Sequence, residues 1–192
     1  MKPLILATAT MLAALCSFTH AGESVDTERS TATELIQRLG AALRQEMSSG
    51  GPEGAVVVCR DIAPSLAGEL SRKNGMRVAR VSLKTRNPLL GTPDTWEQTA
   101  LAEFDRLAAA GAKPETLERS EIVTEPEGKY LRYLKAIPVQ PQCLVCHGSS
   151  ASLPDGVKAM LAAEYPHDLA TGYAPGQIRG GVSIKRKLLD GN

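Results

Sequence analysis

Residues 117–139 read LERSEIVTEPEGKYLRYLKAIPV, and this stretch decides the fold class. Two segments, 117–124 and 129–139, lie on either side of the turn signal Glu125-Pro126-Glu127-Gly128. Such an arrangement predicts two antiparallel strands joined by a short turn. The sequence therefore indicates an antiparallel sheet, and the rest of the chain has to supply its other strands and its covering helices.

Apolar residues at helical spacing predict several helices outside this hairpin. The first and longest carries one apolar stripe, formed by Leu35, Ile36, Leu39, Leu43 and Met47. Further helices are expected near residues 62–74, 92–110 and 155–164, and further strands near 76–84 and 178–184. The apolar run 55–59 fits either a buried strand or the start of a helix. Because strands and helices do not strictly alternate, we predict an α+β fold, with an antiparallel sheet flanked by helices and a long N-terminal helix.

The N-terminus has the pattern of a secretory signal peptide. Lys2 precedes an uncharged stretch that ends at Ala21, and Thr19 and Ala21 place small residues at the −3 and −1 positions of a cut before Gly22. We therefore expect a cleaved signal peptide at 1–21, a flexible segment at 22–34 and one domain at 35–187. This order predicts a periplasmic protein.

Charge and hydropathy exclude two classes of partner. The chain has 22 Lys and Arg and 21 Asp and Glu, and cleavage removes only Lys2, so the mature chain is neutral. Nucleic-acid binding would require a basic excess, so we expect none. No second long apolar run follows the signal peptide, so we expect no membrane segment after cleavage.

The stretch Cys143-Leu144-Val145-Cys146-His147 carries the chemistry. Its spacing is typical of covalent c-type haem attachment, in which the two sulfurs join the haem vinyl groups and the histidine reaches the iron. A zinc site would need a second pair of ligands at matching spacing, and none is found. A thioredoxin-like pair fits poorly with the adjacent histidine and the export signal. We predict one haem c, bound at Cys143 and Cys146, with His147 as an iron ligand.

The residues alone leave several alternatives for the second axial ligand. Cys59 is left without a disulfide partner in an oxidising compartment, so it is either a buried structural thiol or a thiolate ligand of the iron. The three alternatives Met47, Met76 and Met160 fit core positions, and His167 lies in a predicted loop. An open iron position also remains. Four basic residues near the strands are candidates for the haem propionates: Arg80, Lys84, Arg86 and Lys135.

Motifs along most of the chain resemble a known family. They are Val58-Cys59 with Ala63-Pro64, Arg80-Val81-Ser82-Leu83-Lys84 with Arg86-Asn87-Pro88, Pro93-Asp94-Thr95-Trp96-Glu97, Leu101-Ala102-Glu103-Phe104, the haem motif, Ala170-Thr171-Gly172-Tyr173 and Ile178-Arg179-Gly180-Gly181-Val182-Ser183. The chain resembles single-haem c-type PAS-like domains, which occur alone in the periplasm or as sensor parts of histidine kinases and chemoreceptors. The resemblance implies a PAS-like fold and iron ligation by His147 and Cys59.

This resemblance implies one of two functions. The first is a redox or small-gas sensor, for NO or CO, that acts through an unknown partner protein. The second is a small soluble electron-transfer cytochrome of the periplasm. An enzyme such as a peroxidase is not expected, because two filled axial positions leave no open iron site.

Overall fold

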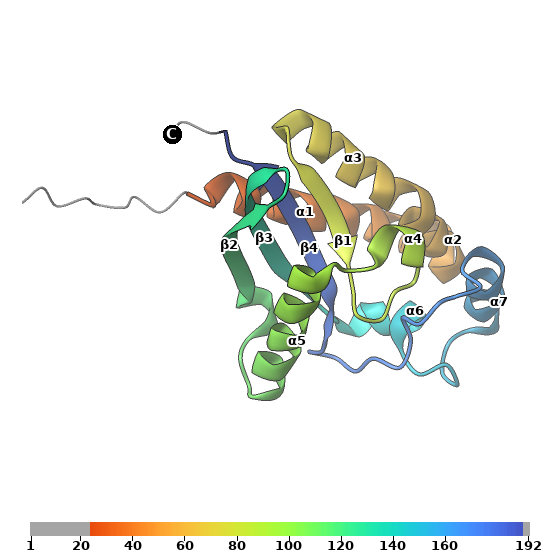
Figure 1. Ribbon diagram of the computed structural model, residues 1–192. Helices are drawn as coiled ribbons and strands as arrows, with labels where there is room; N and C mark the ends of the chain where they lie inside the picture. Colours follow the sequence, from red (N-terminus) through yellow and green to blue (C-terminus); the bar gives the residue numbers. More distant parts are fainter. Residues whose placement is uncertain (1–23, 190–192) are drawn as a thin grey trace, which may run out of the picture.

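The computed structural model describes residues 24–189, which form a four-stranded antiparallel sheet with helices on both faces (Figure 1). The strands are β1 (Arg77–Val81), β2 (Glu118–Glu125), β3 (Gly128–Pro138) and β4 (Ile178–Lys187). The helices are α1 (Asp26–Ser49), α2 (Gly51–Val57), α3 (Ala63–Asn74), α4 (Pro88–Gly91), α5 (Thr95–Ala109), α6 (Leu144–His147) and α7 (Asp155–Glu164). Shorter turns are η1 (Val58–Ile62), η2 (Pro114–Thr116) and η3 (Pro141–Cys143). The predicted α+β class is confirmed, and the predicted signal peptide lies outside the described residues.

The hairpin predicted at residues 117–139 is formed by β2 and β3. Glu125 pairs with Gly128 at its closed end, and Gly128 has a positive φ of 125°, which glycine adopts without strain. The strand order is β1-β4-β3-β2, so the C-terminal strand β4 lies between β1 and the hairpin. The last strand of the chain therefore completes the centre of the sheet.

Alternation along the strands divides the core into two layers. Val78, Tyr133 and Val182 pack on the face that α1 and α3 cover. Leu134 and Ala136 pack on the opposite face, against α5. Side chains that alternate in a strand point to opposite faces, so both faces of this sheet are apolar and both are covered (Figure 1).

The N-terminal helix starts earlier than the sequence predicted. The segment 22–34 was expected to be flexible, but α1 begins at Asp26 and buries Glu28, Thr31 and Ala32. The Glu28 carboxylate is fully buried and accepts a hydrogen bond from Arg186 Nε at 2.6 Å. This contact joins the first turns of α1 to the end of β4, which explains why a polar segment is ordered.

Two local predictions are refined by the structure. The apolar run at 55–59 is helical, since it spans the end of α2 and the start of the π-helical turn η1. Between the predicted strand near 76–84 and the predicted helix near 92–110, the structure adds the short helix α4. None of the helices between residues 24 and 189 has both the length and the hydropathy needed to cross a membrane.

Candidate functional site

A largely apolar cavity of about 810 Å³ lies between the helices of the N-terminal half and strand β1. Its apolar wall includes Leu35, Leu39, Leu43, Val56, Ala63, Ala67 and Val78. The same wall contains Cys59, Cys143, Cys146 and His147. The structure thus brings Cys59, which is remote in the sequence, to the same cavity as Cys143, Cys146 and His147.

The haem motif forms a short helical turn. Pro141 opens η3, which ends at Cys143, and α6 continues through Cys146 and His147. Residues three and four apart lie on the same face of a helix. Cys143, Cys146 and His147 therefore share one face, and all three contribute to the cavity wall.

The imidazole of His147 is held in one orientation. Its Nδ1 lies 2.7 Å from the carbonyl oxygen of Ala170, which makes Nδ1 the donor and leaves the lone pair on Nε2. Arg179 Nε lies 3.4 Å from this Nε2 and donates to it. Burial, together with the charges of Arg179 and Arg86, holds the pKa of His147 well below its usual value. The imidazole is therefore neutral at neutral pH, as a metal ligand must be.

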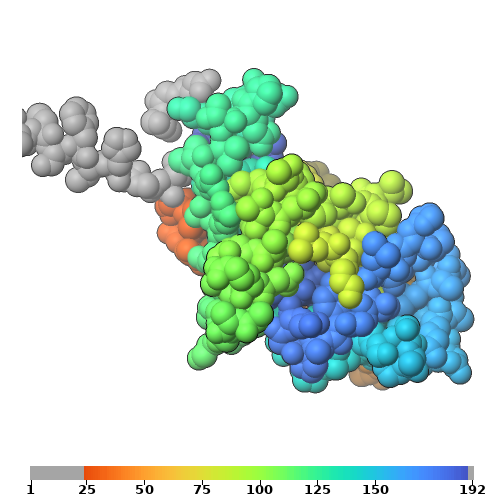
Figure 2. Space-filling model, turned by 60° about the horizontal axis from the view of Figure 1, so that its bottom comes forward, coloured from red at the N-terminus to blue at the C-terminus, as the bar shows by residue number. Residues whose placement is uncertain are grey.

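Backbone hydrogen bonds hold the segment after α7, residues 168–173, against the haem motif. We call residues 168–173 the clamp segment. Gly172 N donates to Gly148 O at 2.7 Å, and Tyr173 N donates to His147 O at 2.9 Å. The Tyr173 ring stands edge-on to the imidazole at 6.2 Å between centroids. Figure 2 shows the segment around residue 170, in blue, beside the segment around residue 148, in cyan.

A buried ion pair supports this clamp. Arg86 donates to Asp168 at 3.2 Å, to Ala170 O at 3.3 Å and to the carbonyl of Cys146. The Asp168 carboxylate in turn accepts a hydrogen bond from Ala170 N at 2.7 Å. The carbonyl that orients His147 is thus fixed by Arg86 and, through the adjacent amide, by Asp168.

Cys59 lies in the π-helical turn η1, a kind of turn that occurs frequently at functional sites. Cys59, Cys143 and Cys146 are all free thiols. Burial raises the pKa of Cys146 to about 11, and the nearby Cys59 and Cys143 add to the effect. A redox-active cysteine requires a lowered pKa, so this environment does not suit a thioredoxin-like pair.

The model of one protein family, Tll0287-like, matches residues 19–186. The chain belongs to the Tll0287-like family. Among solved structures, the crystal structure of the cyanobacterial heme-protein Tll0287 is 24% identical and has a TM-score of 0.63. The match covers 88% of this chain and 100% of that one, so the two proteins share a fold. A search of curated proteins returned no match.

In this Tll0287-like chain, the alternative axial ligands differ in whether they line the cavity. Met47 lines the cavity. Met76 is buried in the core with residues of α1 and α3, and Met160, a residue of α7, packs against another core cluster. His167 is exposed and does not line the cavity. Cys59 and Met47 are therefore the two alternatives that the fold places with His147.

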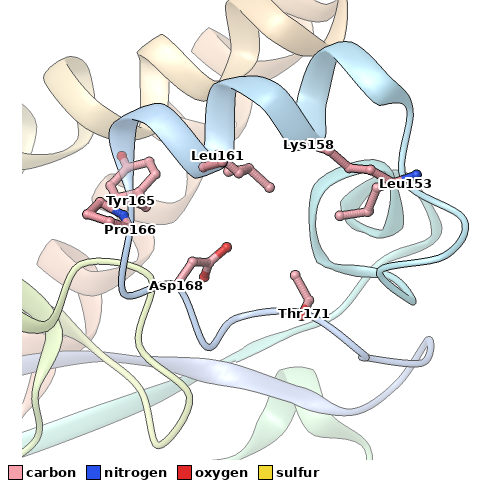
Figure 3. A pocket seen from close by; sticks show the side chains of 8 residues that line it. Leu153, Lys158, Leu161, Tyr165, Pro166, Asp168 and Thr171 are labelled. Atoms are coloured by element: carbon pink, nitrogen blue, oxygen red, sulfur yellow. The ribbon is translucent and has the colours of Figure 1, made fainter.

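A second cavity of about 380 Å³ lies between α7 and the clamp segment of this family member. Figure 3 shows Leu161 from α7 and Tyr165, which directly follows α7, on one side, and Asp168 and Thr171 from the following segment on the other. Tyr165 lines both cavities, so the two are separated by little more than this ring. Within residues 24–189, no three His, Cys, Asp or Glu side chains are grouped to hold a metal ion.

Sequence reasoning missed one residue of the site, Arg179. It is the first residue after Ile178 in β4, and its guanidinium reaches His147 from the start of that strand. Nothing in the local pattern distinguishes it from a solvated arginine. Of the four basic residues named from the sequence, Arg80 and Arg86 line the cavity, and Lys84 and Lys135 do not.

Proposed function

We propose that this protein binds one haem c covalently through Cys143 and Cys146, with His147 as an axial ligand. The observation that carries the proposal is the apolar cavity of about 810 Å³ whose wall holds this complete motif. Cofactor sites in proteins are mostly apolar and have volumes of about 300–1,000 Å³. The family relationship agrees, because the solved relative is described as a heme-protein.

The residues present fit this cofactor. The Ala170 carbonyl holds Nδ1 of His147, so the lone pair of Nε2 is available to iron. Cys143 and Cys146 are free thiols, and both line the cavity on the same helical face as this imidazole. When bound, haem supplies an iron that changes oxidation state and accepts axial ligands.

We propose Cys59 as the second axial ligand. It is a free thiol on the same cavity wall, and it lies near enough to Cys146 to influence that thiol's pKa. Thiolate is a soft, anionic ligand that favours ferric iron and lowers the reduction potential. The PAS-like character implied by the resemblance belongs to this proposal as well.

On this basis we propose a periplasmic redox or small-gas sensor that acts through a partner protein. The second candidate is a soluble electron carrier, and the short helix α4 favours it. Leu89 is 93% exposed, and Leu90, which is 57% exposed, also lines the cavity. An apolar rim beside a redox cofactor suits brief docking of an electron-transfer partner.

Covalent attachment is tested first. Chain matured in a periplasm with a c-type haem attachment system should keep its haem after denaturation and acid–acetone extraction. The double variant Cys143→Ser/Cys146→Ser should lose all covalent haem, because no sulfur remains to form a thioether. Cys59→Ser is the matched control and should keep covalent haem. Loss of haem from the wild-type chain during extraction would contradict the proposal.

Axial ligation is tested on the attached haem. The ferric wild-type protein should give the low-spin thiolate signature in optical and electron paramagnetic resonance spectra, and Cys59→Ser should abolish it. Met47→Leu is the control on the same wall and should leave the spectra unchanged. A His/Met spectrum of the wild type that Met47→Leu abolishes and Cys59→Ser leaves unchanged would instead assign the ligand to Met47. Titration of the ferrous protein with CO and NO then separates the functions, since a gas sensor binds them and a carrier with two firm ligands does not.

A further inference from the structure

The charged side chains that line the large cavity are all arginines. They are Arg44, Arg60, Arg80, Arg86 and Arg179, and no Asp or Glu is among the lining residues. An apolar cavity with cationic side chains and no carboxylate is complementary to an amphiphilic anion. An arginine can bind such an anion only if no carboxylate of the protein already neutralises its charge.

Two of the five are already neutralised by the protein. Arg60 pairs with Asp61 at 2.8 Å and with Glu164 at 2.7 Å. Arg86 pairs with Asp168 at 3.2 Å and is occupied by the clamp. Arg44 is exposed, so water solvates its charge. Arg80 and Arg179 remain.

Neither Arg80 nor Arg179 has a carboxylate partner among residues 24–189. Arg80 is partly buried, and its side chain has no hydrogen-bond or ion-pair partner among those residues. Arg179 donates only to neutral acceptors: Ser82 Oγ at 2.8 Å, Lys84 O at 3.1 Å and His147 Nε2. Arg179 is partly buried, and Arg80 and Arg86 lie near enough for their charges to act on it. Two like charges thus converge without an anion, which is unfavourable unless a ligand supplies one.

We propose that Arg80 and Arg179 bind the two propionate carboxylates of the haem, an inference that rests on the proposed haem function. Guanidinium groups match carboxylates with paired hydrogen bonds, and they do so better than ammonium groups. In this arrangement the apolar side chains of the cavity would contact the haem macrocycle, and the two arginines would bind the propionates at its edge. If His147 Nε2 were to bind the haem iron, Arg179 would lose that acceptor, and its N–H groups would be available to a carboxylate.

The structure also explains why the lysines named from the sequence are not chosen. Lys84 Nζ donates to the Thr171 carbonyl and lies 4.4 Å from the centre of the Tyr173 ring. Lys135 Nζ donates to Glu115 O and lies 3.9 Å from the Glu118 carboxylate. Both are committed to protein partners away from the cavity.

The test uses haem-loaded protein and its reduction potential. Arg80→Gln and Arg179→Gln each remove a positive charge that favours ferrous iron. At a fixed ambient potential, each variant should lower the ferrous-to-ferric ratio about tenfold, which equals about 59 mV for a one-electron couple. Arg80→Lys and Arg179→Lys keep the charge and should restore most of the ratio. Arg44→Gln removes the same charge from the exposed end of the lining and should change the ratio less than threefold.

A crystal structure of the haem-loaded wild-type protein gives a second measurement that needs no variant. It should show a propionate oxygen within hydrogen-bond distance of each guanidinium group. Propionates more than 4 Å from both groups, or equal effects of Arg44→Gln and the two test variants, would overturn the proposal. Absence of covalent haem from the wild-type chain would instead overturn the proposed function, so the two failures are distinguishable.

Discussion

Chain produced without haem should unfold at a temperature about 10–20 °C lower than the haem-loaded protein. The cavity occupies about 810 Å³ and is lined by apolar side chains of α1, α2 and α3. At about 24 cal/mol for each Å³ of unfilled volume, keeping it open would cost roughly 20 kcal/mol. Single domains have a total stability of only about 5–15 kcal/mol. The apo chain therefore has to admit water or let its helices collapse inward.

A small part of the free-energy cost of the unfilled cavity is enough to produce the expected shift in melting temperature. Water entering from the surface relieves most of it, and a residual of about 5 kcal/mol lowers the melting temperature by about 10–20 °C in a chain of this size. The sequence offers little to refill the space, because it contains only two Phe and one Trp. Covalently bound haem stays on the unfolded chain, and it stabilises the folded state because only the folded cavity removes its apolar surface from water.

Calorimetry of two preparations of the same sequence measures this difference. One is made in the cytoplasm without haem attachment, and the other is matured in the periplasm. The variant Cys143→Ser/Cys146→Ser, studied with and without added hemin, is the control, since it separates filling of the cavity from covalent attachment. Coincident melting curves for the two preparations would show that the core does not depend on haem.

The sequence predicted those parts of the fold that depend on local patterns. The turn signal at 125–128 gave the β2–β3 hairpin, and alternation from Ile178 to Ile184 gave β4. The position of β4 between β1 and β3 was not predictable, because pairing of residues about a hundred positions apart leaves no local signal. The ordered start of α1 escaped prediction for the same reason, since Glu28 is buried by its contact with Arg186 near the far end of the chain.

The candidate site divides in a similar way. Spacing alone identified Cys143, Cys146 and His147, and counting cysteines identified Cys59. Which arginines reach the cavity depends on strand register, so the sequence could not separate Arg80 from Lys135 or find Arg179. The PAS-like description and the His147/Cys59 ligand pair came from resemblance and remain predictions. What the structure adds to the sequence is therefore the set of contacts between segments that are remote in the chain.

The substitution Arg86→Gln should have the largest effect of any single change outside the haem motif. Arg86 and Asp168 are 8% and 11% exposed and form one ion pair. Removing one partner of a buried pair leaves the other charge uncompensated and costs about 3–5 kcal/mol. The loss also frees the carbonyls of Cys146 and Ala170, which Arg86 binds in the wild type. The midpoint of urea unfolding of the haem-loaded protein should fall accordingly.

The same substitution should reach the iron through His147. The Ala170 carbonyl is shared between Arg86 and His147 Nδ1. Without Arg86 this oxygen becomes a stronger acceptor for the imidazole N–H, which makes the imidazole a more basic ligand. The reduction potential should therefore fall, although Arg86 is proposed to touch neither the haem nor the iron. Asp168→Asn should lower stability without this second effect, because it leaves the Arg86 to Ala170 contact in place.

Two further variants make the prediction specific to this buried network. Arg38→Gln removes an arginine that pairs with Glu69 at 2.7 Å near the surface, and it should change stability much less than Arg86→Gln. The double variant Arg86→Gln/Asp168→Asn should be more stable than the sum of the two single effects predicts, because the uncompensated carboxylate is gone. If Arg86→Gln is no worse than Arg38→Gln, the clamp on His147 is held by its backbone hydrogen bonds alone. If stability falls but the potential does not, the Ala170 carbonyl does not transmit the change to the imidazole.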